Sequence, residues 1–231
     1  MRLELFDDNI GAVEYVSHMG DDLSVVNAAR VSFGVEKEQV DEKDKKLINY
    51  LMAHNHTSPF EHCAITMRFT VPLFIRSQHH RHRTWAYNEI SRRYTEIDLQ
   101  FYAPDSFRTQ HKSNRQASNN ELIDPMLAGL LNGYDYATDA VKQHHTQSLA
   151  LYGALIDAGV CREQARGVLP QNLYTQYYGT VNLHNLLKFI SLRQHEGAQW
   201  EIQQVAAACL KIAEHHFPVS VAAYKKHKMG D

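Results

Sequence analysis

The segment from Ile65 to Pro72 constrains the fold of this chain more than any other part of the sequence. Apolar residues at positions 65, 67, 69 and 71 alternate with Thr66, Arg68 and Thr70. Side chains of a β-strand point alternately to the two faces of a sheet, so this period of two predicts a half-buried strand that Pro72 ends. The fold must therefore contain a sheet with one face in the core.

Helical periodicity of the apolar residues accounts for much of the remaining chain. Apolar side chains recur at helical spacing in residues 41–54, 127–134, 149–156, 183–190 and 200–216. The first helix begins on Asp41, Glu42 and Asp44, whose carboxylates suit the positive end of a helix dipole. Gly159 is expected to end the helical pattern that precedes it.

The order of these elements predicts the fold class. A β-rich stretch at residues 173–181 interrupts the helical patterns, and the polar segment 110–120 is expected to be an exposed loop. The sequence contains no linker, low-complexity tract or repeat of solenoid length. We therefore expect one mixed α/β (α+β) domain spanning residues 1–231, with a central sheet that contains antiparallel strands and a helix-rich second half.

Charge and cysteine content exclude several classes of protein. The chain carries 24 Lys and Arg against 26 Asp and Glu, a net charge of -2, so no global field attracts it to nucleic acid or an anionic membrane. Its three cysteines, Cys63, Cys161 and Cys209, are widely spaced and cannot all pair, which favours a reducing, cytoplasmic setting. No leader-like segment and no window of membrane-span length is present, so we expect a soluble protein with no membrane partner.

Positive charge is concentrated between residues 76 and 93. The charged and histidine residues of this segment are Arg76, His79, His80, Arg81, His82, Arg83, Glu89, Arg92 and Arg93. Guanidinium groups present rigid forks of donors that match phosphate and carboxylate oxygens, so the cluster could form an anion site. A solvated basic face is the alternative. The embedded Asn88, Ser91 and Tyr94 favour recognition of a polar anionic ligand, because a solubilising face does not need such mixed hydrogen-bonding groups.

The segment from Arg81 to Tyr94 resembles the signature of flavin-dependent thymidylate synthases, R-H-R-x-x-S-x-N-E-x-S-x-R-Y. Ala86 departs from it, because the signature has serine at that position. The resemblance extends to five further segments, which are Ala29–Phe33, His56–His62, Val168–Pro170, Asn172–Thr175 and Ala198–Ile202. It therefore covers most of the chain rather than a single motif.

The resemblance implies a methyltransferase and flavoprotein of dTMP biosynthesis. Such an enzyme converts dUMP to dTMP with 5,10-methylenetetrahydrofolate as the one-carbon donor and with FAD, reduced by NADPH, as the hydride donor. The resemblance also implies a homotetramer whose active sites are shared between subunits. No metal is expected, and the partners would be small molecules rather than nucleic acid.

The resemblance also assigns site residues. Those expected to bind dUMP are Gln78, His79, His80, Arg81, Glu89, Ile90, Ser91, Arg92, Arg93, Arg166 and Arg193. Those expected around FAD are Ser58, Arg81, His82, Arg83, Glu89, Asn182, Leu183, His184 and Lys188. Lys188 and Gly197 differ from the residues common in the family at these positions.

The residues themselves agree with parts of this assignment. The dinucleotide-binding fingerprint G-x-G-x-x-G is absent, so side chains must hold a flavin. Asn182, His184 and Lys188 open a predicted helix whose first-turn amides could face a phosphate, although their spacing also fits ordinary surface polarity. Positions 182, 186, 189, 190 and 193 share one face of that helix, which lets Arg193 point toward a buried substrate.

The expected chemistry depends on positive charge rather than on a nucleophile. A folate-only thymidylate synthase activates uracil C6 with a cysteine thiolate, but residues 81–94 contain no cysteine. Cys63 is expected to be buried packing, and Cys161, although it precedes Arg162 near a helix start where a thiol pKa can fall, is not assigned a catalytic role. Ser91 lacks a suitable base and is assigned to substrate positioning. Arg193 is the expected catalytic residue, because its cation would stabilise an anionic form of the uracil ring.

Two other functions remain open from the residues alone. The 15 histidines include the pairs His144–His145 and His215–His216 and raise a metal-dependent hydrolase, but H-E-x-x-H is absent and the neighbouring arginines would repel a cation. The arginines could also act with Trp85, Tyr87 and Tyr94 to clamp and stack RNA. The near-neutral total charge and the compact patch fit a mononucleotide better than a polymer.

Overall fold

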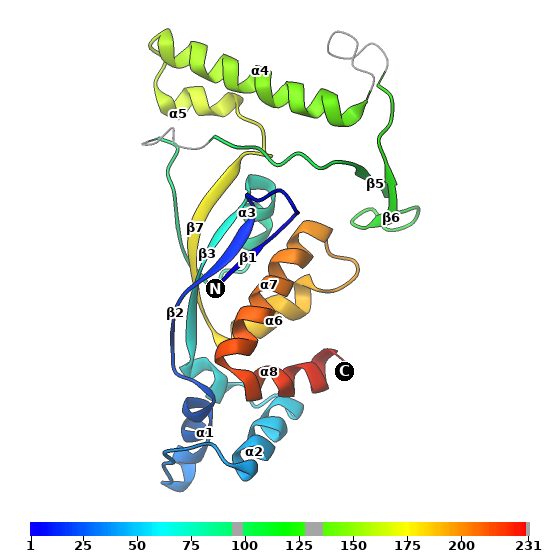
Figure 1. The fold of residues 1–231 in the computed structure, drawn as a ribbon. Helices are drawn as coiled ribbons and strands as arrows, with labels where there is room; N and C mark the ends of the chain where they lie inside the picture. The colour runs from blue at the N-terminus through cyan, green and yellow to red at the C-terminus, as the bar shows by residue number, and fades with distance from the viewer. Residues whose placement is uncertain (94–98, 128–135, 230–231) are drawn as a thin grey trace.

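A five-stranded antiparallel sheet, in the order β1-β2-β3-β7-β4, forms the centre of the molecule (Figure 1). The computed structural model describes residues 1–93, 99–127 and 136–229. The strands are β1 (Arg2–Glu4), β2 (Ala12–Met19), β3 (Ala64–Pro72), β7 (Tyr174–Asn182) and β4 (Ala86–Glu89). The mixed α/β class and the antiparallel sheet expected from the sequence are confirmed.

The longest pairing in this sheet joins β3 to β7. Nine residue pairs connect the two strands, from Ala64 opposite Asn182 to Pro72 opposite Tyr174. The apolar residues of the predicted alternation, Ile65, Met67, Phe69 and Val71, are all fully buried, whereas Thr66, Arg68 and Thr70 are not. The predicted half-buried strand is therefore confirmed.

Two helices cover the buried face of the sheet. α6 (Leu183–Arg193) follows β7 directly, and α7 (Trp200–His216) packs beside α6 and against β2 (Figure 1). Both confirm helices predicted from apolar spacing, and their buried side chains, such as Ile190 and Ile202, join the same core as β3.

A second helical layer closes the end of the sheet where β3 begins. Its members are α1 (Asp22–Arg30), the 3-10 turns η1 (Val31–Phe33) and η2 (Ser58–His62), α2 (Glu42–Ala53), α8 (Pro218–Tyr224) and a π-helical turn, η4 (Lys225–Met229). α2 packs against α8, so the C-terminal part of the chain lies beside its N-terminal third (Figure 1). The helix predicted at residues 41–54 is confirmed as α2.

The segments between β4 and β7 form the opposite end of the molecule (Figure 1). They comprise a separate hairpin of β5 (Phe107–Gln110) and β6 (Ser118–Ile123), followed by α4 (Ala137–Asp157), α5 (Arg162–Ala165) and η3 (Arg166–Val168). α4 confirms the helical pattern at 149–156, and Gly159 follows it with a φ of 87°, in agreement with the predicted stop.

One expectation for this part of the chain is corrected, and another is not tested. The segment 110–120 is not a loop throughout, because its ends belong to β5 and β6. The backbone N–H and C=O groups of these two strands are paired with one another. The helical pattern predicted at 127–134 falls almost wholly on residues 128–135, which lie outside the described residues. Within the described ranges, no helix is both long enough and apolar enough to cross a membrane.

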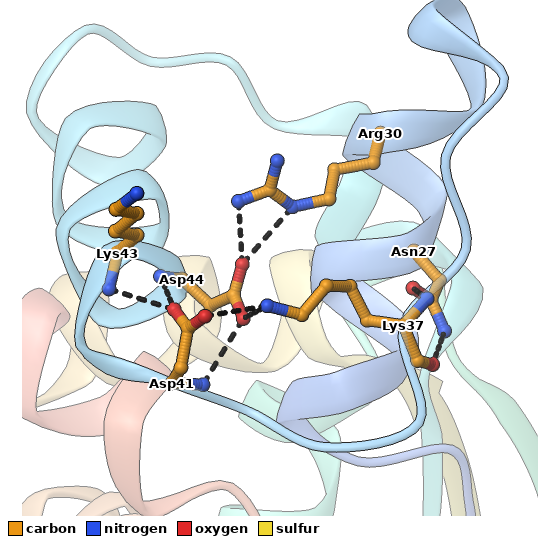
Figure 2. Close-up of polar contacts among 6 residues, drawn as sticks. All are labelled: Asn27, Arg30, Lys37, Asp41, Lys43 and Asp44. Atoms are coloured by element: carbon orange, nitrogen blue, oxygen red, sulfur yellow. Dashed lines mark hydrogen bonds and ion pairs between the residues drawn. The ribbon is translucent and has the colours of Figure 1, made fainter.

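A buried carboxylate ties α1 to α2 (Figure 2). Asp44 is fully buried, and its Oδ1 accepts hydrogen bonds from Nε and Nη2 of Arg30 at 3.0 and 2.6 Å. Its Oδ2 lies 3.0 Å from Nζ of Lys37 and also accepts the backbone N–H of Asp41. Burial alone raises the pKa of Asp44, but the Asp41 N–H and the two cations outweigh it and leave the pKa lowered. The segment between α1 and α2 is thereby anchored.

Replacement of Asp44 by Ala should lower the free energy of unfolding by about 2 kcal/mol, because Arg30 and Lys37 lose their carboxylate but remain partly hydrated. Urea unfolding at pH 7 measures the change, and Lys43→Ala is the control, since only the backbone N–H of Lys43 joins the network.

Because the folded-state pKa of Asp44 lies below its ordinary value of 3.8, the stabilisation holds above that pH and disappears as pH falls through the folded-state pKa. Equal stability of wild type and Asp44→Ala at pH 7 would contradict this role.

Candidate functional site

The arginine and histidine cluster folds as a helix, a turn and an edge strand. α3 (Leu73–His79) leaves β3 directly after Pro72, which ends the strand as predicted. Residues 80–85 form the turn, and β4 then pairs with β7, with Glu89 opposite Tyr177. The cluster therefore begins at the end of the central strand β3 and ends on the edge strand β4, and its residues range from the buried His79 to the exposed Arg81, Arg83 and Arg93.

A polar cavity of about 570 Å³, the β4 cavity, lies where β4, η3 and the start of β7 meet. Five residues predicted to bind dUMP line it, namely Glu89, Ile90, Ser91, Arg92 and Arg166. Arg76 and Thr175 line it as well. Arg76, Arg92 and Arg166 outnumber the two acidic lining residues, Glu89 and Glu163, so the lining carries the net positive charge that an anion site needs.

Hydrogen bonds hold the walls of the β4 cavity in place. Oε1 of Glu89 accepts Nε of Arg76 at 3.1 Å and the Thr175 hydroxyl at 2.6 Å. Nη2 of Arg92 donates to the backbone oxygen of Tyr174 at 3.1 Å. The prediction missed Arg76 and Thr175 as site residues, because a contact between two strands far apart in the sequence leaves no local signal. Their only signals were the position of Arg76 in the basic cluster and that of Thr175 in a family-like segment.

A second cavity of about 310 Å³, the α6 cavity, lies between α6, α2 and α8. Its walls are mainly apolar and include Leu51, Met52, Phe60, Leu187, Leu192 and Tyr224. His56, His184 and Lys188 add polar and cationic groups. Two residues predicted around FAD, His184 and Lys188, therefore line one cavity, and Ser58 lies in η2 beside its lining residue Thr57.

Arg193 and His82 form the closest link between the signature segment and α6. Nε of Arg193 donates to Nε2 of His82 at 2.9 Å, so the proton of the neutral imidazole is on Nδ1. Burial, followed by the charges of Arg193 and Lys188, lowers the pKa of His82 to about 4. His82 is therefore neutral at pH 7 and does not oppose the charge of Arg193. Nη2 of Arg193 also lies 3.5 Å from the backbone oxygen of Gln78.

Three predicted site residues use their side chains for structure. His79 is fully buried among aromatic rings, its Nδ1 lies 2.8 Å from the Tyr177 hydroxyl, and burial holds its pKa well below the usual value. Leu183 is fully buried in the core. Oδ1 of Asn182 accepts the backbone N–H of Asn185 at 2.9 Å and caps α6. Because the side chains of His79 and Leu183 are fully buried, only their backbone groups could contact a ligand.

The other predicted residues surround these contacts. The ring of His80 stacks on Tyr87 with centroids 4.0 Å apart, while Arg81, Arg83 and Arg93 are exposed in this chain. Gln78 is half-buried on α3. In the part of the chain that the structure describes, no three His, Cys, Asp or Glu residues are grouped to hold a metal ion.

The two cavities share no lining residue and lie near opposite ends of β7. Thr175 lines the β4 cavity, whereas Asn182, seven residues later, caps the helix that lines the α6 cavity. At about 3.4 Å per residue, this stretch of strand spans roughly 24 Å. One chain therefore does not bring all the predicted site residues into a single cavity.

Comparisons with known proteins agree on one family. The sequence model of a family described as thymidylate synthase complementing protein matches residues 14–219. A flavin-dependent thymidylate synthase from Thermus thermophilus is 43% identical over 217 residues, which cover 94% of this chain and 76% of the relative. One from Thermotoga neapolitana is 40% identical over 227 residues, which cover 98% and 95%. The crystal structure of a UMP/dUMP methylase from Streptomyces cacaoi bound with 5-Br dUMP superposes with a TM-score of 0.78, at 33% identity and 98% coverage of both chains.

The contact between Arg193 and His82 predicts a change in a histidine pKa. Replacing Arg193 with Gln should raise the pKa of His82 from about 4, since a neighbouring positive charge disappears while burial remains. Titration of the His82 ring signals by NMR, assigned with a His82→Gln variant, measures the shift. Arg193→Lys retains the charge and should give a smaller rise. An unchanged His82 pKa in Arg193→Gln would mean that the two side chains do not interact as described.

Proposed function

We propose that this chain, which belongs to the flavin-dependent thymidylate synthase family, converts dUMP to dTMP with 5,10-methylenetetrahydrofolate as one-carbon donor and FAD, reduced by NADPH, as hydride donor. The observation that carries this proposal is the position of the signature segment. Its Glu89, Ser91 and Arg92 line the β4 cavity, and its His82 contacts Arg193 on the helix that lines the α6 cavity.

The β4 cavity suits the phosphate of dUMP. Arg92 and Arg166 can offer forked N–H donors, and the hydroxyl of Ser91 can offer a further donor to phosphate oxygens. Glu89 is engaged by Arg76 and Thr175, so its charge is partly compensated and opposes an incoming anion less than a free carboxylate would. We assign these residues to substrate binding.

The α6 cavity fits part of a flavin nucleotide. Its apolar walls suit a flat aromatic ring, and its cationic and polar groups, Lys188 and His184, suit phosphate oxygens or ring carbonyls. His184 and Lys188, together with Ser58 in η2, would hold the cofactor, which agrees with the absence of a glycine-rich fingerprint. When bound, FAD supplies the hydride that completes the methyl group, and the protein supplies binding and orientation.

We further propose a homotetramer with active sites shared between subunits. Two observations support it. The cavities that carry the predicted residues lie near opposite ends of β7 in one chain. Val31 and Phe33, which flank Ser32 in a family-like segment, have 71% and 82% of their surfaces exposed, as residues of an interface would in a single chain. In the proposed assembly, the β4 cavity of one subunit would hold the phosphate of dUMP, and Gln78 and Arg193 of a neighbouring subunit would contact the base.

The residues of this chain favour electrostatic catalysis over a cysteine nucleophile. Arg193 is partly buried, and its guanidinium would stabilise negative charge that develops on the uracil ring, with the neutral His82 keeping it in place. Burial raises the pKa of Cys63 to about 12 and raises that of Cys209 as well, so neither thiol supplies a thiolate. All three cysteines are free, which supports the cytoplasmic location that we propose.

The flavin spectrum tests the proposed function most directly. Purified protein reconstituted with FAD should show flavin absorbance that NADPH bleaches anaerobically and that returns when dUMP and methylenetetrahydrofolate are added together. A sample without dUMP is the control, because it shows any oxidation of the reduced flavin that does not depend on turnover. A protein that binds no flavin, or a reduced flavin that the two substrates leave unchanged, would refute the proposal.

Substitution of Ser91 by Ala separates positioning from nucleophilic catalysis. In the described structure, the contact that Ser91 makes is the backbone N–H of Arg93 donating to its Oγ at 3.3 Å, and no base activates it. We therefore expect Ser91→Ala to lose on the order of 1 kcal/mol of dUMP binding, about a fivefold rise in KM, with measurable turnover. Ser113→Ala, on the hairpin turn, is the control. A covalent dUMP adduct on Ser91, or complete loss of turnover with intact dUMP binding, would contradict this role.

A further inference from the structure

A relay of hydrogen bonds runs from the β5–β6 hairpin to Gln78 on α3. Nη2 of Arg108 on β5 donates to the two carboxylate oxygens of Glu201 at 2.7 and 2.8 Å. Oε2 of Glu201 in turn accepts Nε2 of Gln199 at 2.9 Å. Oε1 of Gln199 then accepts Nε2 of Gln78. Neither Arg108, Gln199 nor Glu201 is among the residues that the family resemblance assigned to the site.

The carboxylate of Glu201 is the fixed point of this relay. Only 4% of Glu201 is exposed, and it also accepts the Tyr102 hydroxyl at 3.1 Å. Burial and the neighbouring carboxylate raise the pKa of Tyr102, so this phenol keeps its proton and acts as a donor. Arg108 is held in turn by Ser118, 3.1 Å from its Nε, and by the Trp200 ring, 5.4 Å from its guanidinium carbon. An ionised carboxylate paired with arginine accepts hydrogen bonds and cannot donate them.

This restriction sets the orientation of both amides. Gln199 must turn its NH2 group toward Glu201, because its oxygen would meet another acceptor there. Its oxygen therefore faces Gln78, and Gln78 must turn its own NH2 group toward that oxygen. The side-chain oxygen of Gln78 is left facing away from the relay, with no hydrogen bond to any described residue. A glutamine with no such contacts could rotate its amide, but the relay holds the NH2 group of Gln78 and leaves its side-chain oxygen as the acceptor for a ligand.

We propose that Arg108, Glu201 and Gln199 are positioning residues that hold Gln78 as an acceptor and so select uracil over cytosine in the nucleotide. The inference rests on the proposed function, which places dUMP at Gln78 and Arg193. Uracil presents an N3–H donor beside the O4 acceptor, whereas cytosine presents an N3 acceptor beside an amino donor. The Gln78 oxygen and the nearby Arg193 guanidinium, whose Nη2 lies 3.5 Å from the Gln78 backbone oxygen, complement the uracil edge. Cytosine would leave both groups mismatched.

The decisive variants change the polarity at position 199. In Gln199→Lys the ammonium can pair with Glu201 and donate to Gln78, which then turns its oxygen inward and its NH2 group toward the base. In Gln199→Leu the amide of Gln78 is free to rotate. Gln204→Leu on the same helix is the control, because Gln204 lies outside the relay. Thermal unfolding of each variant identifies any loss of folding.

The measurement is the Kd of dUMP and of dCMP for the FAD-loaded protein, by calorimetry. We expect the ratio of dCMP Kd to dUMP Kd to fall about tenfold in Gln199→Leu and further in Gln199→Lys, and to remain at the wild-type value in Gln204→Leu. Arg108→Ala should lower the ratio as well, since it releases Glu201. Equal weakening of both nucleotides in folded Gln199 variants would show a structural role only and overturn the inference. Failure of the wild-type protein to bind dUMP would instead refute the proposed function.

Discussion

The pairing of β3 with β7 is the constraint on which the rest of this structure depends. Because the two strands are antiparallel, α3 leaves β3 at one end of the pair and α6 leaves β7 at the other. α6 then turns back along the sheet for 11 residues, roughly 16 Å. This return brings Arg193, at the end of α6, to His82 in the turn after α3. The register of two strands thus determines which distant residues meet.

Close packing around this pair leaves little freedom in the site. Gly179 on β7 has no side chain, and a Cβ there would lie 2.9 Å from the Phe69 ring and 3.1 Å from Trp85. The same aromatic rings enclose His79, which is consequently neutral and contributes no charge. Arg193 therefore lies beside uncharged histidines, which do not repel its guanidinium group, and its positive charge is available to a ligand.

Sequence patterns predicted the elements better than the contacts between them. The period of two at residues 65–71 and the helical spacing at 200–216 correspond to β3 and α7, because burial of one face leaves a local periodic record. The segment 110–120 was predicted as a loop although its ends belong to β5 and β6, since these mostly polar strands carry no apolar alternation. Glu201 lay in a family-like segment, but its partner Arg108 is 93 residues away, and no pattern connected them.

The sequence by itself determined the family, the half-buried strand and the basic signature segment, because these depend on residue type and local spacing. Only the tertiary structure decided what each polar group does: His79 packs in the core, Asn182 caps α6, and Gln78 is held with its oxygen free. The physical reason is that burial and hydrogen-bond polarity arise from neighbours brought together by folding. A glutamine or a histidine has the same letter in the sequence whether it faces a ligand, a helix end or an aromatic core.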